Sequence, residues 1–153
     1  MQSYPLQLLL ADDDDDDDDD DCFLFEEALS EIPVTTQLTT VNNGEQLMQL
    51  LTKITDTLPH LLFLDLNMPR KNGFQCLNEI KQNEKLKNLP VIIFSTSCQD
   101  DVAEQLYKGG AQHYICKPNN FAQLKKLIHQ VLTLPVGKET NSHPSTKENF
   151  VLE

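Results

Sequence analysis

The sequence predicts an α/β fold, a doubly wound parallel sheet of five strands with helices on both faces. Two short runs, Leu61–Leu64 and Val91–Phe94, are apolar throughout, which is typical of strands buried on both faces of a parallel sheet. Strand-like segments of this kind alternate along the chain with segments whose apolar residues recur at helical spacing. The alternation favours parallel strands joined by right-handed crossovers.

The first half of the chain supplies two strands and two helices. The first strand is predicted over Leu6–Ala11, and the unbroken aspartate run Asp12–Asp21 ends it. A helix follows and stops at Pro33, and Thr35–Val41, rich in β-branched residues, predicts the second strand. A turn at 42–44 then caps the second helix. The apolar residues that define these helices are Phe25, Ala28, Leu29 and Ile32, and then Leu47, Leu50, Leu51 and Ile54.

The second half continues the alternation. Strands are predicted at 61–65, 91–95 and 113–116, and a helix is predicted after each of them. These elements complete one domain over residues 1–135, and the polar, aperiodic residues 136–153 are expected to form a disordered tail. The expected helix ends are a start near Gly73, a cap at Asp100 or Asp101, a stop at Gly109–Gly110, and a cap at Asn119 or Asn120.

Composition limits the classes of function. The net charge is −12, but the aspartate run accounts for most of it, and no basic stripe indicates nucleic-acid binding. No apolar run approaches the roughly 20 residues of a membrane span, and the first residues do not resemble a signal peptide, so we expect a cytoplasmic protein. The four cysteines show no metal-ligand spacing and are expected to be passive thiols rather than disulfides.

Polar residues lie at the carboxyl ends of four of the five predicted strands. They are Asp12 and Asp13, Asp65, Ser95 and Lys117. Because parallel strands deliver their carboxyl ends to one edge of the sheet, we expect these side chains to meet there. Crowded carboxylates require a cation such as Mg²⁺, and a carboxylate beside a metal, an ammonium and a hydroxyl can form an aspartyl phosphate.

These residues resemble the response-regulator receiver domain, the CheY-like fold of two-component signalling. The matches are the acidic pair after the first strand, Asp65 within LDLNMPRKNG, Ser95 after VIIF, and Lys117 within YICKP. The resemblance covers Leu6 to about Leu134 and implies the flavodoxin-like strand order 2-1-3-4-5. The segment DLNMPRKNGF is most similar to small stand-alone regulators associated with phytochrome-type histidine kinases.

The resemblance implies a role for each matching residue. Asp65 would be the phosphoacceptor, and Lys117 would pair with a phosphoryl oxygen. The hydroxyl of Ser95 would move toward the phosphoryl group, and the ring of Tyr114 would follow it as a switch. The bond between Lys117 and Pro118 would be cis, which only X–Pro bonds adopt at low cost.

The remaining implied roles concern the metal and the phosphoryl lifetime. Asp13 would bind Mg²⁺, or Mn²⁺, directly, and Asp12 would bind it through water. Asp65 and the backbone carbonyl of Asn67 would be the remaining protein ligands of the metal. Asn67 and Ser97 lie at positions that tune dephosphorylation in the family.

The aspartate run departs from the family pattern, which has two or three acids at this place. Adjacent like charges repel, and Asp is favourable only in the first turn of a helix. We therefore expect the surplus to form a solvated loop, with the helix starting late in the run. Asp12 and Asp13 are preferred as ligands because they follow the strand directly, but Asp14 remains an alternative, and a role for the surplus is open.

The predicted function is a single-domain response regulator rather than an enzyme. A histidine kinase or a histidine phosphotransfer protein would donate the phosphoryl group. The phosphorylated form would signal through the face of the fourth helix, fifth strand and fifth helix, to a downstream protein or a second copy. Two alternatives are a haloacid-dehalogenase-type phosphatase, which normally carries its nucleophile on the first strand, and a pseudo-receiver that binds partners without phosphorylation.

Overall fold

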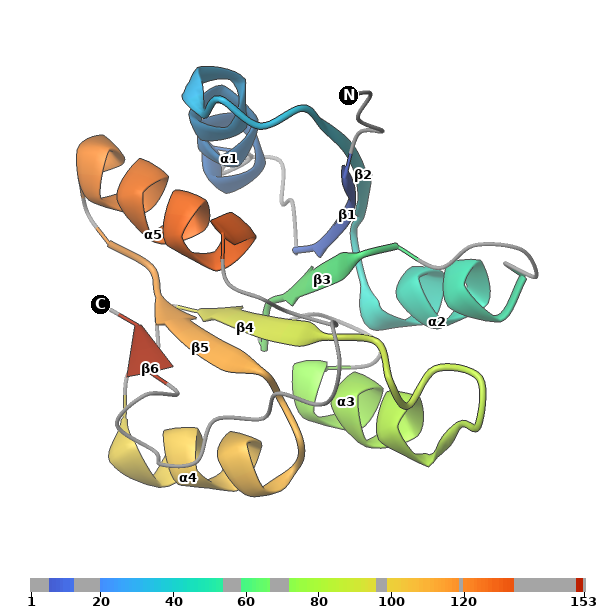
Figure 1. The fold of residues 1–153 in the computed structure, drawn as a ribbon. Coiled ribbons are helices and arrows are strands. Elements are labelled where there is room, and N and C mark those ends of the chain that lie inside the picture. Colours follow the sequence, from blue (N-terminus) through green and yellow to red (C-terminus); the bar gives the residue numbers. More distant parts are fainter. Residues whose placement is uncertain are drawn as a thin grey trace.

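The computed structural model describes residues 6–12, 20–53, 59–66, 72–95, 99–118, 120–133 and 151–152, and these form the predicted α/β architecture (Figure 1). Helices and strands alternate through the domain. In chain order they are β1 (Leu6–Ala11), α1 (Asp20–Glu31), β2 (Thr36–Val41), α2 (Gly44–Lys53), β3 (Leu61–Leu64), α3 (Gly73–Gln82), β4 (Val91–Ser95), α4 (Asp100–Lys108), β5 (His113–Cys116), α5 (Phe121–Thr133) and β6 (Val151–Leu152).

The sheet has the order β2-β1-β3-β4-β5-β6, and each neighbouring pair is parallel. The predicted order of the first five strands, 2-1-3-4-5, is therefore confirmed. The register aligns Ala11 with Leu64, and Ser95 with Cys116. Each of these residues is the last of its strand, so the residues that follow them emerge at one edge of the sheet.

The sixth strand was not predicted. Val151 and Leu152 belong to the segment that the sequence assigns to a polar tail, yet they pair with Tyr114 and Ile115 of β5. Residues 134–150 and Glu153 lie outside the described part of the chain.

Two helical layers cover the sheet. Figure 1 shows α1 and α5 on one face and α2, α3 and α4 on the other. Successive side chains of β1 point to opposite faces of the sheet and so contribute to both cores. Leu8 and Leu10 pack with the α1 and α5 layer, whereas Leu9 and Ala11 pack on the opposite face. Burial on both faces also explains why the central strand β3 is apolar throughout and β4 is apolar up to Ser95.

Polar side chains cap three of the helices, and the caps of α2 and α5 were predicted. Asn43 and Asn120 accept hydrogen bonds from the backbone amides three residues ahead, at 2.8 and 3.0 Å. Asn72 forms a capping box with Gln75 at the start of α3. Helix α1 begins at Asp20, so the prediction of a start late in the aspartate run is confirmed.

The predicted cap of α4, Asp100 or Asp101, is wrong. Gln99 is the N-cap, without a side-chain capping bond, and Asp100 and Asp101 occupy the first turn. Their carboxylates still stabilise the helix there through its dipole. The predicted stop is confirmed, because α4 ends at Lys108 and Gly110 follows with φ at 98°. None of the described helices combines the length and apolarity that crossing a bilayer requires.

Candidate functional site

Asp12 and Asp65 lie side by side at the carboxyl edge of the sheet. The backbone amide of Asp12 donates to the carbonyl of Val41 at 3.1 Å, and that of Asp65 donates to the carbonyl of Ala11 at 2.9 Å. The ladder between β1 and β2 therefore continues to Asp12, and the ladder between β1 and β3 continues to Asp65. Both residues are buried, with exposed fractions of 2% and 6%. Two neighbouring carboxylates are thus held away from bulk water.

Lys117 brings a positive charge to this pair from β5. Its backbone amide donates to the carbonyl of Ser95 at 2.9 Å, which fixes the lysine beside the end of β4. Its Nζ lies 3.4 Å from Oδ2 of Asp12 and 3.5 Å from Oδ2 of Asp65. The ammonium also lies 4.9 Å from the centroid of the Phe94 ring, in cation–π range. One ammonium therefore contacts two carboxylates whose strands are separate in sequence.

Carboxylates outnumber the ammonium in the ion pairs of this cluster. Among the described residues, two buried carboxylates face the single ammonium of Lys117. A divalent cation would offset this excess, and Mg²⁺ commonly takes one or two carboxylates while it keeps several waters. Asp12 and Asp65 thus fit a hard divalent cation by donor type and by charge.

The structure places only part of the predicted metal site. Asp13 and Asn67 lie outside the described residues, as does Asp14. Within the described ranges no group of three or more His, Cys, Asp or Glu side chains could hold a metal ion. The carboxylates of Asp12 and Asp65 are therefore the predicted ligands that the structure places.

Ser95 of β4 and Tyr114 of β5 lie in the strands that adjoin the cluster of Asp12, Asp65 and Lys117. Ser95 is fully buried at the end of β4, and its carbonyl accepts the amide bond from Lys117. Tyr114 pairs with Ile93 in the ladder, is 1% exposed, and has its pKa raised by burial. The two predicted switch residues thus occupy adjacent strands. Ser97, predicted to tune dephosphorylation, lies outside the described residues.

Gly73 is a positioning residue that the sequence analysis treated only as a helix start. Its amide donates to the carbonyl of Leu66 at 3.0 Å. A Cβ at this position would stand 2.6 Å from the carbonyl oxygen of Asp65 and 2.7 Å from Cα of Leu66. The absence of a side chain therefore lets α3 begin directly against the backbone of Asp65. The Asn–Gly dipeptide before the helix is the sequence signal for this close approach.

Two other expectations around Lys117 are wrong. Among the described residues no peptide bond is cis, so the bond between Lys117 and Pro118 is trans, the form that X–Pro bonds prefer by about 0.5–1 kcal/mol.

Cys116 is disulfide-bonded, although the cysteines were expected to be passive thiols. Its partner is not among the side chains that the structure describes, whereas Cys76 is a buried free thiol, as expected.

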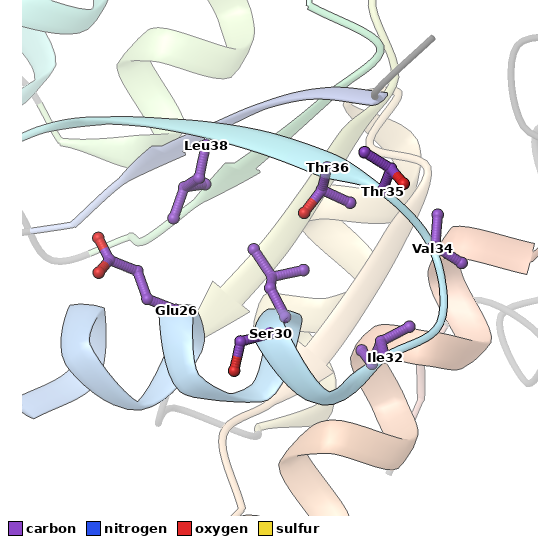
Figure 2. A pocket seen from close by; sticks show the side chains of 8 residues that line it. Glu26, Ser30, Ile32, Val34, Thr35, Thr36 and Leu38 are labelled. Carbon is purple, nitrogen blue, oxygen red and sulfur yellow. The ribbon is translucent and has the colours of Figure 1, made fainter. Parts of the chain in front are cut away.

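A cavity of about 370 Å³ lies elsewhere, between α1 and β2 (Figure 2). Figure 2 shows Glu26, Ser30 and Ile32 on the side of α1 and Thr36 and Leu38 on β2. None of the residues that converge on Lys117 lines it. The buried ion cluster, and not this cavity, is therefore the candidate functional site.

The chain is similar to a known family of domains. Residues 15–129, more than half of the chain, match the response regulator receiver domain family. The match begins inside the aspartate run, after β1 and Asp12. Among curated proteins, the chain is 30% identical over 89 residues to the probable methanogenesis regulatory protein FilR2 of Methanothrix harundinacea, covering 58% of this chain and 57% of that protein. It is 36% identical over 86 residues to the response regulator Rcp1 of Synechocystis, covering 52% of this chain and 58% of Rcp1. The matched segment thus spans somewhat more than half the length of these relatives.

Solved structures extend the similarity over nearly the whole chain. The phosphorylated cyanobacterial phytochrome response regulator RcpA is 30% identical with a TM-score of 0.75, covering 93% of this chain and 100% of RcpA. The Mn²⁺-bound form of Rcp1 is 30% identical with a TM-score of 0.74, covering 92% of this chain and 100% of Rcp1. The chain therefore belongs to the response regulator receiver domain family, whose members bind a divalent cation and interact with histidine kinases and downstream partners.

Proposed function

We propose that Asp65 of this response regulator is the phosphoacceptor, and that a histidine kinase or a histidine phosphotransfer protein is the donor. The observation that carries the proposal is the position of Lys117 Nζ, 3.4 Å from Asp12 and 3.5 Å from Asp65. A phosphoryl group on Asp65 would lie next to this ammonium. The phosphoacceptor would therefore form one ion pair before transfer and a stronger, more highly charged one after it.

The transfer requires little covalent chemistry from the protein. A carboxylate oxygen of Asp65 attacks the phosphorus, the P–N bond of the phosphohistidine breaks, and the bonding electrons leave with the imidazole, which takes up a proton. Lys117 holds one phosphoryl oxygen and Ser95 donates its hydroxyl to another, since positioning and positive charge dominate this reaction. Mg²⁺, held by Asp12 and Asp65 with Asp13 and the backbone carbonyl of Asn67, would supply further positive charge; the Mn²⁺-bound Rcp1 structure supports a divalent cation at such a site.

In this proposal, phosphorylation changes the binding surface of the domain, and a partner recognises the changed surface. We propose that the hydroxyl of Ser95 moves toward the phosphoryl group, that the ring of Tyr114 follows, and that Asn67 and Ser97 set the phosphoryl lifetime. The face formed by α4, β5 and α5 would then bind a downstream protein or a second copy. The chain acts in this scheme as a phosphoacceptor and not as a turnover enzyme. A cytoplasmic location and the absence of nucleic-acid and membrane partners stay predictions from the sequence.

The two alternatives have less support. A haloacid-dehalogenase-type phosphatase would place its nucleophile at the end of the first strand, whereas Asp65 follows β3, the third strand along the chain. A pseudo-receiver would need no ammonium between its carboxylates, yet Lys117 is held there by backbone and side-chain contacts. Turnover of a generic phosphomonoester would favour the phosphatase, and an unlabelled Asp65 would favour the pseudo-receiver.

The test is labelling of the full chain with a small acyl phosphate and Mg²⁺, followed by intact mass. We expect one phosphoryl group per chain, none on Asp65→Asn, and ordinary labelling of the matched control Asp100→Asn, which changes an exposed carboxylate in the first turn of α4. Equal labelling of Asp65→Asn and the control would overturn the assignment.

A further inference from the structure

The β5 edge of the sheet is covered by a strand from the chain itself. β5 pairs with β4 on one side and with β6 on the other, so that without β6 it would be an edge strand. The pairing is parallel and aligns Tyr114 with Val151 and Ile115 with Leu152. Figure 1 shows β6 beside β5, on the side away from β4. An uncovered strand edge presents unpaired N–H and C=O groups and readily accepts another extended segment.

The side chains of Tyr114 and Ile115 in β5 are buried, so a ligand could contact mainly the backbone at the edge of this strand. Tyr114 packs in the core that contains Ala103 and Leu106 of α4, and Ile115 packs in the opposite core with Leu127 of α5. Both β5 residues are almost completely buried. A ligand at this edge would therefore be bound by main-chain hydrogen bonds along an extended segment, as in strand addition.

The cover is short enough to be removed. β6 has two residues, so few backbone hydrogen bonds are lost when it leaves, and short peripheral elements open locally at low cost. The intervening chain between α5 and β6 keeps the strand at a high effective concentration near its site. A tethered strand of this kind competes well with a free ligand until either the edge or the strand changes.

We propose that Val151–Leu152 is an intramolecular cover strand that occupies the β5 edge and masks the face of α4, β5 and α5. The ligand class that fits the uncovered edge is an extended apolar segment running parallel to β5. One further step rests on the proposed function: because Val151 is aligned with Tyr114, the switch residue, phosphorylation of Asp65 loosens the cover strand and opens the edge.

The first test is amide hydrogen exchange in the full chain. In Val151→Asp/Leu152→Asp, we expect the β5 amides that point away from β4 to exchange about tenfold faster or more, because the pairing is lost. The matched control is Val151→Ile/Leu152→Ile, which keeps apolar, strand-favouring residues and should exchange as the wild type does. Unchanged β5 exchange in the aspartate variant would overturn the cover strand.

The second test identifies what the uncovered edge accepts. The probe is a peptide with the sequence of residues 146–153, TKENFVLE. It should bind the aspartate variant about tenfold more tightly than it binds the wild type, whose edge is already occupied. Equal binding to both chains would contradict the proposal. Dimer formation by the aspartate variant in place of peptide binding would also overturn it, since the open edge would then select a second copy.

The link to phosphorylation is tested separately. Exchange of the β5 amides is measured with and without the acyl phosphate, in the wild type and in Asp65→Asn. We expect faster β5 exchange only in the labelled wild type. Labelling without any change in β5 exchange would overturn the link. Absence of labelling would instead reject the proposed function, and the exchange difference between the cover-strand variants would still stand.

Discussion

The carboxyl edge of the sheet and the interior of the same strands have opposite chemistry. Along β3 every residue is apolar and buried, and the next residue, Asp65, is a buried carboxylate. In the interior, Phe25 packs edge-on against Phe63 at 4.9 Å and against Phe94 at 5.5 Å between ring centroids. At the edge, Lys117 contacts two carboxylates with almost no access to water.

The difference separates residues that stabilise the fold from residues that the proposed function requires. Burial of the aromatic side chains removes apolar surface from water and adds favourable ring contacts. Burial of three charges costs desolvation free energy that their attraction only partly offsets. Phe94 belongs to both regions, since its ring packs against Phe25 and also lies under Lys117. The aromatic interior thus contacts the charged cluster directly through Phe94.

The largest expected effect on stability comes from the interior. Phe63→Ala removes a fully buried ring and its contact with Phe25, and should lower the free energy of unfolding by about 3–5 kcal/mol. The measurement is chemical denaturation followed by circular dichroism. Leu24→Ala is the control, because Leu24 is 38% exposed, and it should change the value by no more than about 0.5 kcal/mol. Similar losses in both variants would contradict the division between interior and surface.

The charged edge should respond according to its charge balance. Lys117→Met leaves two buried carboxylates without their counter-charge and should lower the free energy of unfolding by about 3 kcal/mol. Asp65→Asn leaves one carboxylate facing one ammonium, and its stability should equal or exceed that of the wild type. Denaturation curves at low salt compare the two variants. A loss in Asp65→Asn as large as that in Lys117→Met would refute this account of the cluster.

A smaller effect is expected where α3 meets Asp65. Gly73→Ala forces the backbone of Asp65 and Leu66 to move away from the new Cβ, and should cost about 1–3 kcal/mol of stability. It should also slow labelling by the acyl phosphate, because the carboxylate is displaced. Gly109→Ala is the matched control: its Cβ would stand 3.3 Å from the nearest atoms, so the loss should be smaller and labelling should be unaffected.

The smallest effect concerns the pH dependence of stability through Tyr114. Burial raises the pKa of this phenol above its ordinary value of 10.0, so the folded chain holds the proton more tightly than the unfolded chain. The resulting stability is present below pH 10 and is lost as the pH rises through the raised pKa. Between pH 9 and 11 the stability of the wild type should therefore fall more steeply with pH than that of Tyr114→Phe. Tyr107→Phe serves as the control, and a wild-type slope no steeper than that of Tyr114→Phe would count against the assignment.

The fold was predictable because its strands and helices have distinct periods in the sequence. Five apolar or β-branched strands, separated by amphipathic helices, admit few arrangements, and a parallel sheet then gathers the strand ends. The sequence alone therefore assigns Asp12, Asp65, Ser95 and Lys117 to one edge of the sheet.

The features that were missed depend on contacts and not on patterns. Two residues are too few to show a period, so β6 could not be predicted from Val151 and Leu152. The steric role of Gly73 and the position of Phe94 under Lys117 depend on the spacing between neighbouring strands and helices. The trans bond at Pro118 depends on the surrounding structure, because both isomers are accessible to an X–Pro bond.

The most direct test of the central claim locates the phosphoryl group itself. The chain is labelled with a small acyl phosphate and Mg²⁺ and treated with borohydride, which reduces an aspartyl phosphate to homoserine, and the modified residue is then found by peptide mass spectrometry. The account predicts homoserine at position 65 alone. Homoserine within the aspartate run or at Asp100 or Asp101, with Asp65 unmodified, would show that the cluster around Lys117 is not the phosphorylation site.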